Sequence, residues 1–123
     1  MAKFDGNYQT EVHVYDELLM GGNQFETGVL TLSAGEKARA GTVLALDADG
    51  GAYKIAPADA SGALAVLVDN TGFEGAGNFA VRVCIAGKLS RPSLDFAGSV
   101  PTDAQAAALR NYGILALPVV KHQ

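Results

Sequence analysis

The residues of this chain that could act chemically gather in one stretch, VRVCIAGKLS (residues 81–90), which holds Cys84 and Lys88. Cys84 is the only cysteine of the sequence, and a nucleophilic cysteine needs a nearby base, usually a histidine, to hold it as the thiolate. The two histidines, His13 and His122, lie close to the ends of the sequence, where a rigid base is hard to position. We therefore predict that Cys84 is a packed structural residue and that the chain is not an enzyme.

Lys88 could instead carry a covalent group, as a single modified lysine does at the hairpin tip of swinging-arm carrier domains. Its flanking sequence, AGKLS, lacks the methionine that accompanies a biotinylated lysine and the acidic neighbour expected beside a lipoylated one. The sequence favours an exposed lysine on a turn at Gly87, where the preceding strand ends. The alternative function is a small β-barrel carrier or ligand-binding module with Lys88 on that turn.

Two further segments resemble ligand-binding loops. DADGG (residues 47–51) looks like the opening of a calcium loop, but calcium takes roughly six to eight oxygen ligands, and no counterpart of the bidentate closing glutamate follows. GFEGAG (residues 72–77) lacks the lysine with Ser or Thr, and the following helix, of a phosphate-binding loop. We interpret the first as a hairpin turn and the second as a loop, and we expect no metal and no cofactor.

Composition limits the classes of protein to which the chain can belong. Its 123 residues suit one domain with one core, and a hydrophobic content of 49% with 18% charged residues is typical of an ordered chain. A net charge of -4 argues against nucleic-acid binding, which needs a basic face. The sequence has neither the apolar run of roughly 20 residues that crosses a bilayer nor the apolar core of a signal peptide. We expect no contact with nucleic acid or membrane.

From Gly28 onward, short apolar segments alternate with glycine-rich turns, a pattern typical of a β-barrel or sandwich. The predicted strands are residues 28–32, 42–46, 52–55, 63–68, 78–85 and 114–120. PTDAQAAALRNYG predicts a helix before the last of them, because Thr102 and Gln105 have the spacing of a capping box and Gly113 is a typical stop. The sequence thus predicts a mostly β fold, a small β-barrel or sandwich-like domain with one short α-helix before the last strand.

The N-terminal residues 1–27 are polar and mixed, and they carry too little apolar surface to fold alone. One piece, TEVHVY (residues 10–15), shows the short alternation of a strand. The segment is either a frayed terminus or an arm that adds as a strand to a neighbouring protein, with backbone hydrogen bonds supplying the affinity. We divide the chain into an extended N-terminal arm, residues 1–27, and a β-rich domain, residues 28–123.

The order and texture of these segments resemble those of phage head decoration proteins of the lambda type. The similarity lies in the strand GTVLAL, in GAYKIAPADASGALAVLV with its turn of small residues before an apolar strand, in FAVRVCIAGKLSRPSL, and in AAALRNYGILAL, which resembles the helix leading into the final strand. It covers the chain from Gly28 to the end. The sequence departs from the lambda type in its longer arm and its alanine-rich helix.

The resemblance implies a viral structural protein on the outer surface of an icosahedral phage capsid. It implies a homotrimer at local three-fold positions of the expanded shell, where it clamps neighbouring major capsid proteins against internal DNA pressure. In that family the N-terminal segment orders on the capsid and pairs with shell strands. The expected location is the virion, after synthesis in the cytoplasm of the host bacterium. The expected capsid-binding residues are Thr10, Glu11, Val12, His13, Val14 and Tyr15.

Overall fold

The computed structural model describes residues 18–47, 51–60, 62–69 and 71–118. Its strands are β1 (Leu19–Leu32), β2 (Lys37–Ala38), β3 (Val43–Leu46), β4 (Tyr53–Ile55), β5 (Leu64–Leu67), β6 (Phe73–Glu74), β7 (Gly77–Ser90) and β8 (Ile114–Leu117). Between β7 and β8 lie the short 3-10 helix η1 (Arg91–Ser93) and the α-helix α2 (Asp103–Arg110). The mostly β fold and the helix before the last strand confirm the prediction from the sequence.

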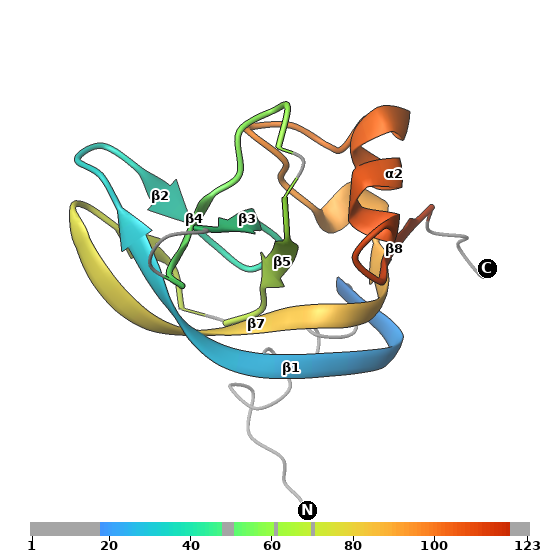
Figure 1. Cartoon of the computed structure of the whole chain (residues 1–123), viewed down its shortest axis with the longest axis horizontal. Helices are drawn as coiled ribbons and strands as arrows, with labels where there is room; N and C mark the ends of the chain where they lie inside the picture. The colour runs from blue at the N-terminus through green and yellow to red at the C-terminus, as the bar shows by residue number, and fades with distance from the viewer. Residues whose placement is uncertain (1–17, 48–50, 61, 70, 119–123) are drawn as a thin grey trace, which may run out of the picture.

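Five of these strands close into a barrel. The sheet order is β1-β4-β3-β5-β7-β8, and β1 also pairs with β7, which closes the run from β1 to β7 into a ring. The long strands β1 and β7 pair antiparallel, from Leu19 opposite Leu89 to Leu32 opposite Gly77, and form a curved ribbon along one side of the barrel (Figure 1). β8 lies outside the ring, parallel to the end of β7. The predicted barrel is therefore present, with one strand added to its rim.

Apolar side chains pack on both faces of the wall formed by β3, β5 and β7, which gives the molecule two cores instead of the one expected from the chain length. The barrel core lies inside the ring and consists of Leu30, Leu32, Ala38, Leu44, Tyr53, Ala65, Leu67, Val81 and Val83. The helix-side core lies outside the wall and consists of Leu18, Val43, Ala45, Ala56, Leu64, Val66, Val68, Cys84, Leu89, Leu94, Phe96, Leu109 and Ile114. β5 is apolar at every position because its successive side chains alternate between these two cores.

The helix α2 covers the outer face of this wall and is held at its start by local contacts. The Thr102 hydroxyl accepts a hydrogen bond from the backbone N–H of Gln105, and the Gln105 side chain accepts one from the Thr102 N–H at 2.9 Å. These bonds form the predicted capping box. Arg91 of η1 donates to the Asp103 carboxylate at 2.8 Å, and Leu109 is fully buried in the helix-side core. The alanine-rich helix is thus fixed by its first turn and by one apolar anchor.

β1 begins earlier than the sequence predicts. The predicted arm, residues 1–27, overlaps this strand, because residues 19–27 pair with β7 and Leu18 is buried in the helix-side core. The predicted strand at residues 28–32 is only the second part of β1. Its first part is mostly exposed and lacks a regular apolar alternation, which is the signal that reveals a strand in a sequence. The capsid-binding residues expected at 10–15 lie outside the described residues.

β7 continues through the point where the sequence predicts a turn. The strand runs to Ser90, and its residues after Gly87 pair with β8 on one side and with the start of β1 on the other. The prediction of a turn at Gly87 is wrong, because this glycine lies within a continuous strand, opposite a bulge that Gly22 and Asn23 form in β1. The φ of Gly87 is +122°, and the register of β1 against β7 shifts between Gly21 and Gln24.

Candidate functional site

Cys84 lies in the helix-side core and has no exposed surface. Its thiol donates to the carbonyl oxygen of Ala86, with the two atoms 3.1 Å apart, and its Sγ accepts from the side-chain nitrogen of Asn23 at 3.7 Å. A thiol enclosed in this way cannot meet a substrate unless the core opens. The predicted structural role of Cys84 fits this position. His13 and His122 lie outside the described residues.

Lys88 is exposed, but it lies in the middle of three paired strands rather than on a turn. Its neighbours across the sheet are Gly21 on β1 and Leu115 on β8. The side-chain nitrogen of Asn23 donates to the Lys88 carbonyl oxygen at 3.0 Å, and the Gly21 N–H donates to the Asn23 side-chain oxygen at 3.0 Å. The alternative function, a carrier with Lys88 on a turn, requires this lysine at a hairpin tip. The structure places Lys88 within a strand instead, so the turn of that alternative is wrong.

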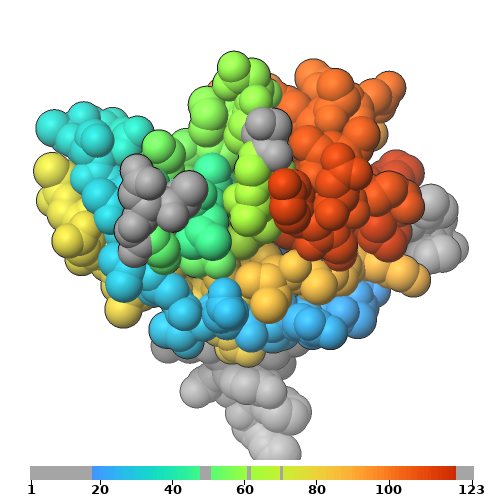
Figure 2. Space-filling model, in the orientation of Figure 1, coloured from blue at the N-terminus to red at the C-terminus, as the bar shows by residue number. Residues whose placement is uncertain are grey.

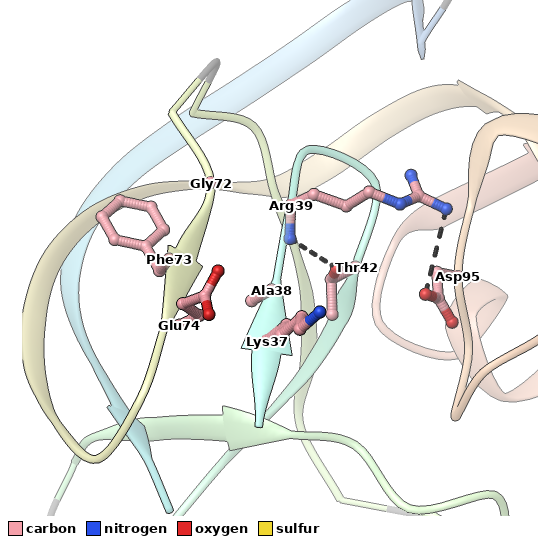
Figure 3. Close-up of a pocket in the computed structure, with 8 residues that line it drawn as sticks. All are labelled: Lys37, Ala38, Arg39, Thr42, Gly72, Phe73, Glu74 and Asp95. Carbon is pink, nitrogen blue, oxygen red and sulfur yellow. Dashed lines mark hydrogen bonds and ion pairs between the residues drawn. The ribbon is translucent and has the colours of Figure 1, made fainter. Parts of the chain in front are cut away.

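Strands β2 and β6, in segments that the sequence predicts as loops, pair with each other and form one side of a surface groove (Figure 3). The groove has a volume of about 450 Å³ and is lined by Lys37, Ala38, Arg39, Thr42, Gly72, Phe73, Glu74 and Asp95. The sequence signal for this site is the alternation of charged and small residues at positions 37–39, which is the two-residue period of a strand. Sequence reasoning missed the groove because two paired residues are too few to stand out from a loop.

The charges of this groove are matched to one another. Lys37 lies directly opposite Glu74 across the β2–β6 pair. The Arg39 guanidinium reaches toward Asp95, with 3.9 Å between its nitrogen and the carboxylate oxygen, as Figure 3 shows. The Thr42 hydroxyl accepts from the backbone N–H of Arg39 at 3.0 Å and fixes the turn between β2 and β3. With two cations beside two carboxylates, the groove favours neither an anion nor a cation.

Tyr53 closes the barrel core against β1. Its hydroxyl donates to the Glu26 carboxylate at 3.3 Å, and its ring lies so close to Gly28 that a Cβ there would be 2.8 Å from the Tyr53 Cε2. Burial and, after it, the neighbouring Glu26 carboxylate raise the pKa of the Tyr53 hydroxyl. These contacts give Tyr53 a packing role between β1 and β4.

The start of β1, the end of β7 and the strand β8 meet at one end of the molecule, which we call the terminal end (residues 19–21, 87–90 and 114–117; Figure 2). There Leu89 pairs with Leu19 on one side and with Ala116 on the other. Since β1 starts and β8 finishes at this end, the described chain both enters and leaves the fold there. Met20, which is 42% exposed, adds an apolar side chain to its surface.

No group of three or more His, Cys, Asp and Glu side chains in the described part of the chain is placed to hold a metal ion. Within the same residues, no helix combines the length and the apolar character needed to span a membrane.

The sequence of this chain matches the model of a known protein family. Residues 7–117 match the family model of the bacteriophage lambda head decoration protein D. The chain belongs to this family. The match includes every strand and helix described above and begins within the N-terminal segment. No curated protein gives a significant match to this chain.

Membership in the head decoration family confirms the resemblance seen in the sequence and assigns the protein to the phage head. Decoration proteins bind the phage capsid, and binding of this kind takes place through the protein surface. Of the two surfaces described, the groove is internally neutralised, whereas the terminal end has an unpaired strand edge among the described residues.

Proposed function

We propose that this decoration protein binds the outer surface of an icosahedral phage head as a homotrimer at local three-fold positions. There it cements neighbouring copies of the major capsid protein against internal DNA pressure. The observation that carries the proposal is the family match over residues 7–117. The role is structural rather than catalytic. The protein is made in the cytoplasm of the host bacterium and ends in the virion, without direct contact with nucleic acid or membrane.

The N-terminal arm supplies one contact with the shell. The family match begins at residue 7 and therefore includes the alternating segment at residues 10–15. An added strand gains affinity from backbone hydrogen bonds, and alternate side chains such as Val12 and Val14 add specificity. Because residues 19–27 belong to β1, the arm of this proposal is residues 1–17.

Trimerisation makes weak individual contacts sufficient. Once one arm of a trimer is bound, the other two arms are held near their sites at a high effective concentration. The avidity of the trimer can then exceed the affinity of one arm by a factor of roughly 100 or more. A small barrel with a short arm can in this way hold several capsid proteins together.

Co-sedimentation with heads of the phage that encodes the protein tests the proposal. We expect the full chain to bind expanded heads, to raise their resistance to heat, and not to bind unexpanded heads. At saturation, the bound mass should correspond to three chains at each local three-fold position. Failure of the full chain to bind expanded heads would overturn the proposed function.

Two truncations test the arm separately. Deletion of residues 1–17 should reduce binding to expanded heads by a factor of 10 or more while the far-ultraviolet circular dichroism stays that of the folded barrel. Deletion of residues 1–6 is the matched control, because it leaves the family-matched segment whole, and it should bind as the full chain does. If the 1–17 deletion also binds like the full chain, the arm has no part in the contact.

A further inference from the structure

The outer edge of β8 has backbone groups that no described residue pairs with. β8 is the last strand of its sheet and pairs with β7 alone. The Gly87 N–H donates to the Gly113 carbonyl oxygen at 3.0 Å, which fixes the orientation of the ladder. Successive residues of a strand direct their backbone groups to opposite sides, so Leu115 and Leu117 face β7, as Gly113 does. Ile114 and Ala116 then direct their N–H and carbonyl groups outward.

The side chains on both faces of this edge are largely apolar. Ile114 is buried in the helix-side core, and Ala116 packs against it. Leu115 and Leu117 are half-buried on the opposite face, next to Lys88 and Ser90 of β7. An unpaired strand edge of this character is a template for another extended chain, because it offers backbone hydrogen bonds together with apolar contacts.

We propose that the outer edge of β8 accepts an extended segment of the major capsid protein as an added strand. The inference rests on the proposed function and adds to it a second contact, separate from the N-terminal arm. The position of the edge supports this occupant. Leu19 and Ala116 flank Leu89 on its two sides, so they lie about 10 Å apart, two strand spacings. The arm joins the barrel at Leu18, so a capsid surface that the arm binds close to this residue also lies next to β8.

The small size of the edge argues against a second copy of this chain as the occupant. β8 has four residues, of which two direct their backbone groups outward. A stable protein–protein interface buries roughly 1,200–2,000 Å² in total, far more than one pair of such short strands provides. A contact this small is useful where other contacts already hold the partner in place, as an arm bound to the shell does.

Hydrogen exchange at single amides tests the inference with the full chain, free and bound to expanded heads. In the free protein the outward Ala116 N–H should exchange fast, whereas the Leu115 N–H, bonded toward β7, should exchange slowly. On the heads, Ala116 exchange should slow by a factor of 10 or more, and Leu115 serves as the internal control that stays slow in both states. Equal Ala116 exchange in both states would overturn the inference, and so would an Ala116 N–H already protected in the free protein.

Substitution at the same position gives an independent test. Ala116→Pro removes the outward N–H without removing a bond to β7, and proline is tolerated on edge strands. It should weaken binding to expanded heads by a factor of about 10, equivalent to roughly 1.4 kcal/mol, while Ala116→Val, which keeps the N–H, should bind like the parent. Normal binding by Ala116→Pro would overturn the inference but leave the proposed function standing. If the parent chain itself fails to bind, the proposed function fails with it.

Discussion

The β1–β7 ribbon has two halves that are built in different ways. In the barrel half, residues 25–32 pair without interruption with residues 77–84 and supply Leu30 and Val81 to the barrel core. In the terminal half, residues 19–24 face residues 86–89, and the register shifts at three places between Leu19 and Phe25. The regular half closes the barrel, whereas the irregular half brings in β8 and lets the chain leave the fold.

The difference shows how a bulge reassigns the two faces of one strand. Val83 lies in the barrel core and Leu89 in the helix-side core, although they are an even number of residues apart. A regular strand would place both on one face, and a slip of one residue reverses the faces. On β7 the extra residue is Ile85, between Cys84, which pairs with Phe25, and Ala86, which pairs with Gln24. This irregularity reverses the faces of β7, so that Leu89 is buried in the helix-side core and Lys88 is exposed. One half of the β1–β7 ribbon thus closes the barrel, and the other half holds β8, whose outer edge is exposed.

The largest effect is expected from substitution of Gly87, which lies opposite the bulge of β1. We expect Gly87→Ala to lower the free energy of unfolding by about 3 kcal/mol, because φ of +122° disfavours any side chain and a Cβ there would lie 2.6 Å from the Asn23 Cα. The midpoint and slope of urea unfolding measure the loss.

A second glycine of the terminal half is the control for this variant. Gly22 also has a positive φ, +65°, but a Cβ there would meet nothing within 4 Å. Gly22→Ala should therefore cost about 1 kcal/mol, the penalty of the left-handed backbone alone. Equal losses for the two variants would show that crowding at Gly87 does not hold the bulge.

The barrel half is tested through the contact of Gly28 with Tyr53. We expect Gly28→Ala to destabilise the fold by about 1–3 kcal/mol, because the added methyl group displaces the Tyr53 ring from a packed core. In a Tyr53→Leu background the same substitution should cost less by about 1 kcal/mol or more, since the ring is gone. Four urea unfolding curves give this coupling energy, and additive losses would contradict the packing described here.

The smallest expected effect is a loss of stability at alkaline pH through Tyr53, which belongs to the barrel core. The Tyr53 pKa is raised above its ordinary value of 10.0, so the folded chain keeps this proton at pH values where the unfolded chain loses it. The stabilisation is complete below pH 10 and is lost as the pH rises from there through the folded pKa. Tyr53→Phe should cost about 1 kcal/mol at neutral pH through the lost bond to Glu26, and it should lose less stability than the parent above pH 10.

Urea unfolding at pH 8 and at about pH 10.5 measures this difference. If the parent and Tyr53→Phe lose the same free energy of unfolding between these pH values, the Tyr53 hydroxyl does not cause the loss of stability at alkaline pH.

Much of the fold could be predicted because the signals are local. The capping box at Thr102 and Gln105 needs four neighbouring residues, and the structure shows both of its bonds. The continuous apolar run of β5 predicts a strand buried on both faces, as it is. Alternation also placed Val83 and Cys84 on opposite faces of β7 correctly. Each of these depends on spacing along the chain and not on a distant partner.

The candidate sites were harder to predict, because their partners are far away in the sequence. The first half of β1 has no apolar alternation, and it is a strand because β7 lies beside it. The groove joins β2 and β6 with Asp95, three segments that share no motif. A glycine before a lysine is typical of a turn, and only the pairing of β7 with both β1 and β8 shows that Gly87 lies within a strand.

The sequence by itself determined the family, the β-rich class, the helix and the burial of Cys84, since composition and short periods encode which residues avoid water. The closure of the barrel, the start of β1 at Leu19 and the exposure of the β8 edge depend on the tertiary structure. The physical reason is that a strand's backbone bonds are made with another segment, so its pairing and its free edges exist only once the chain has folded.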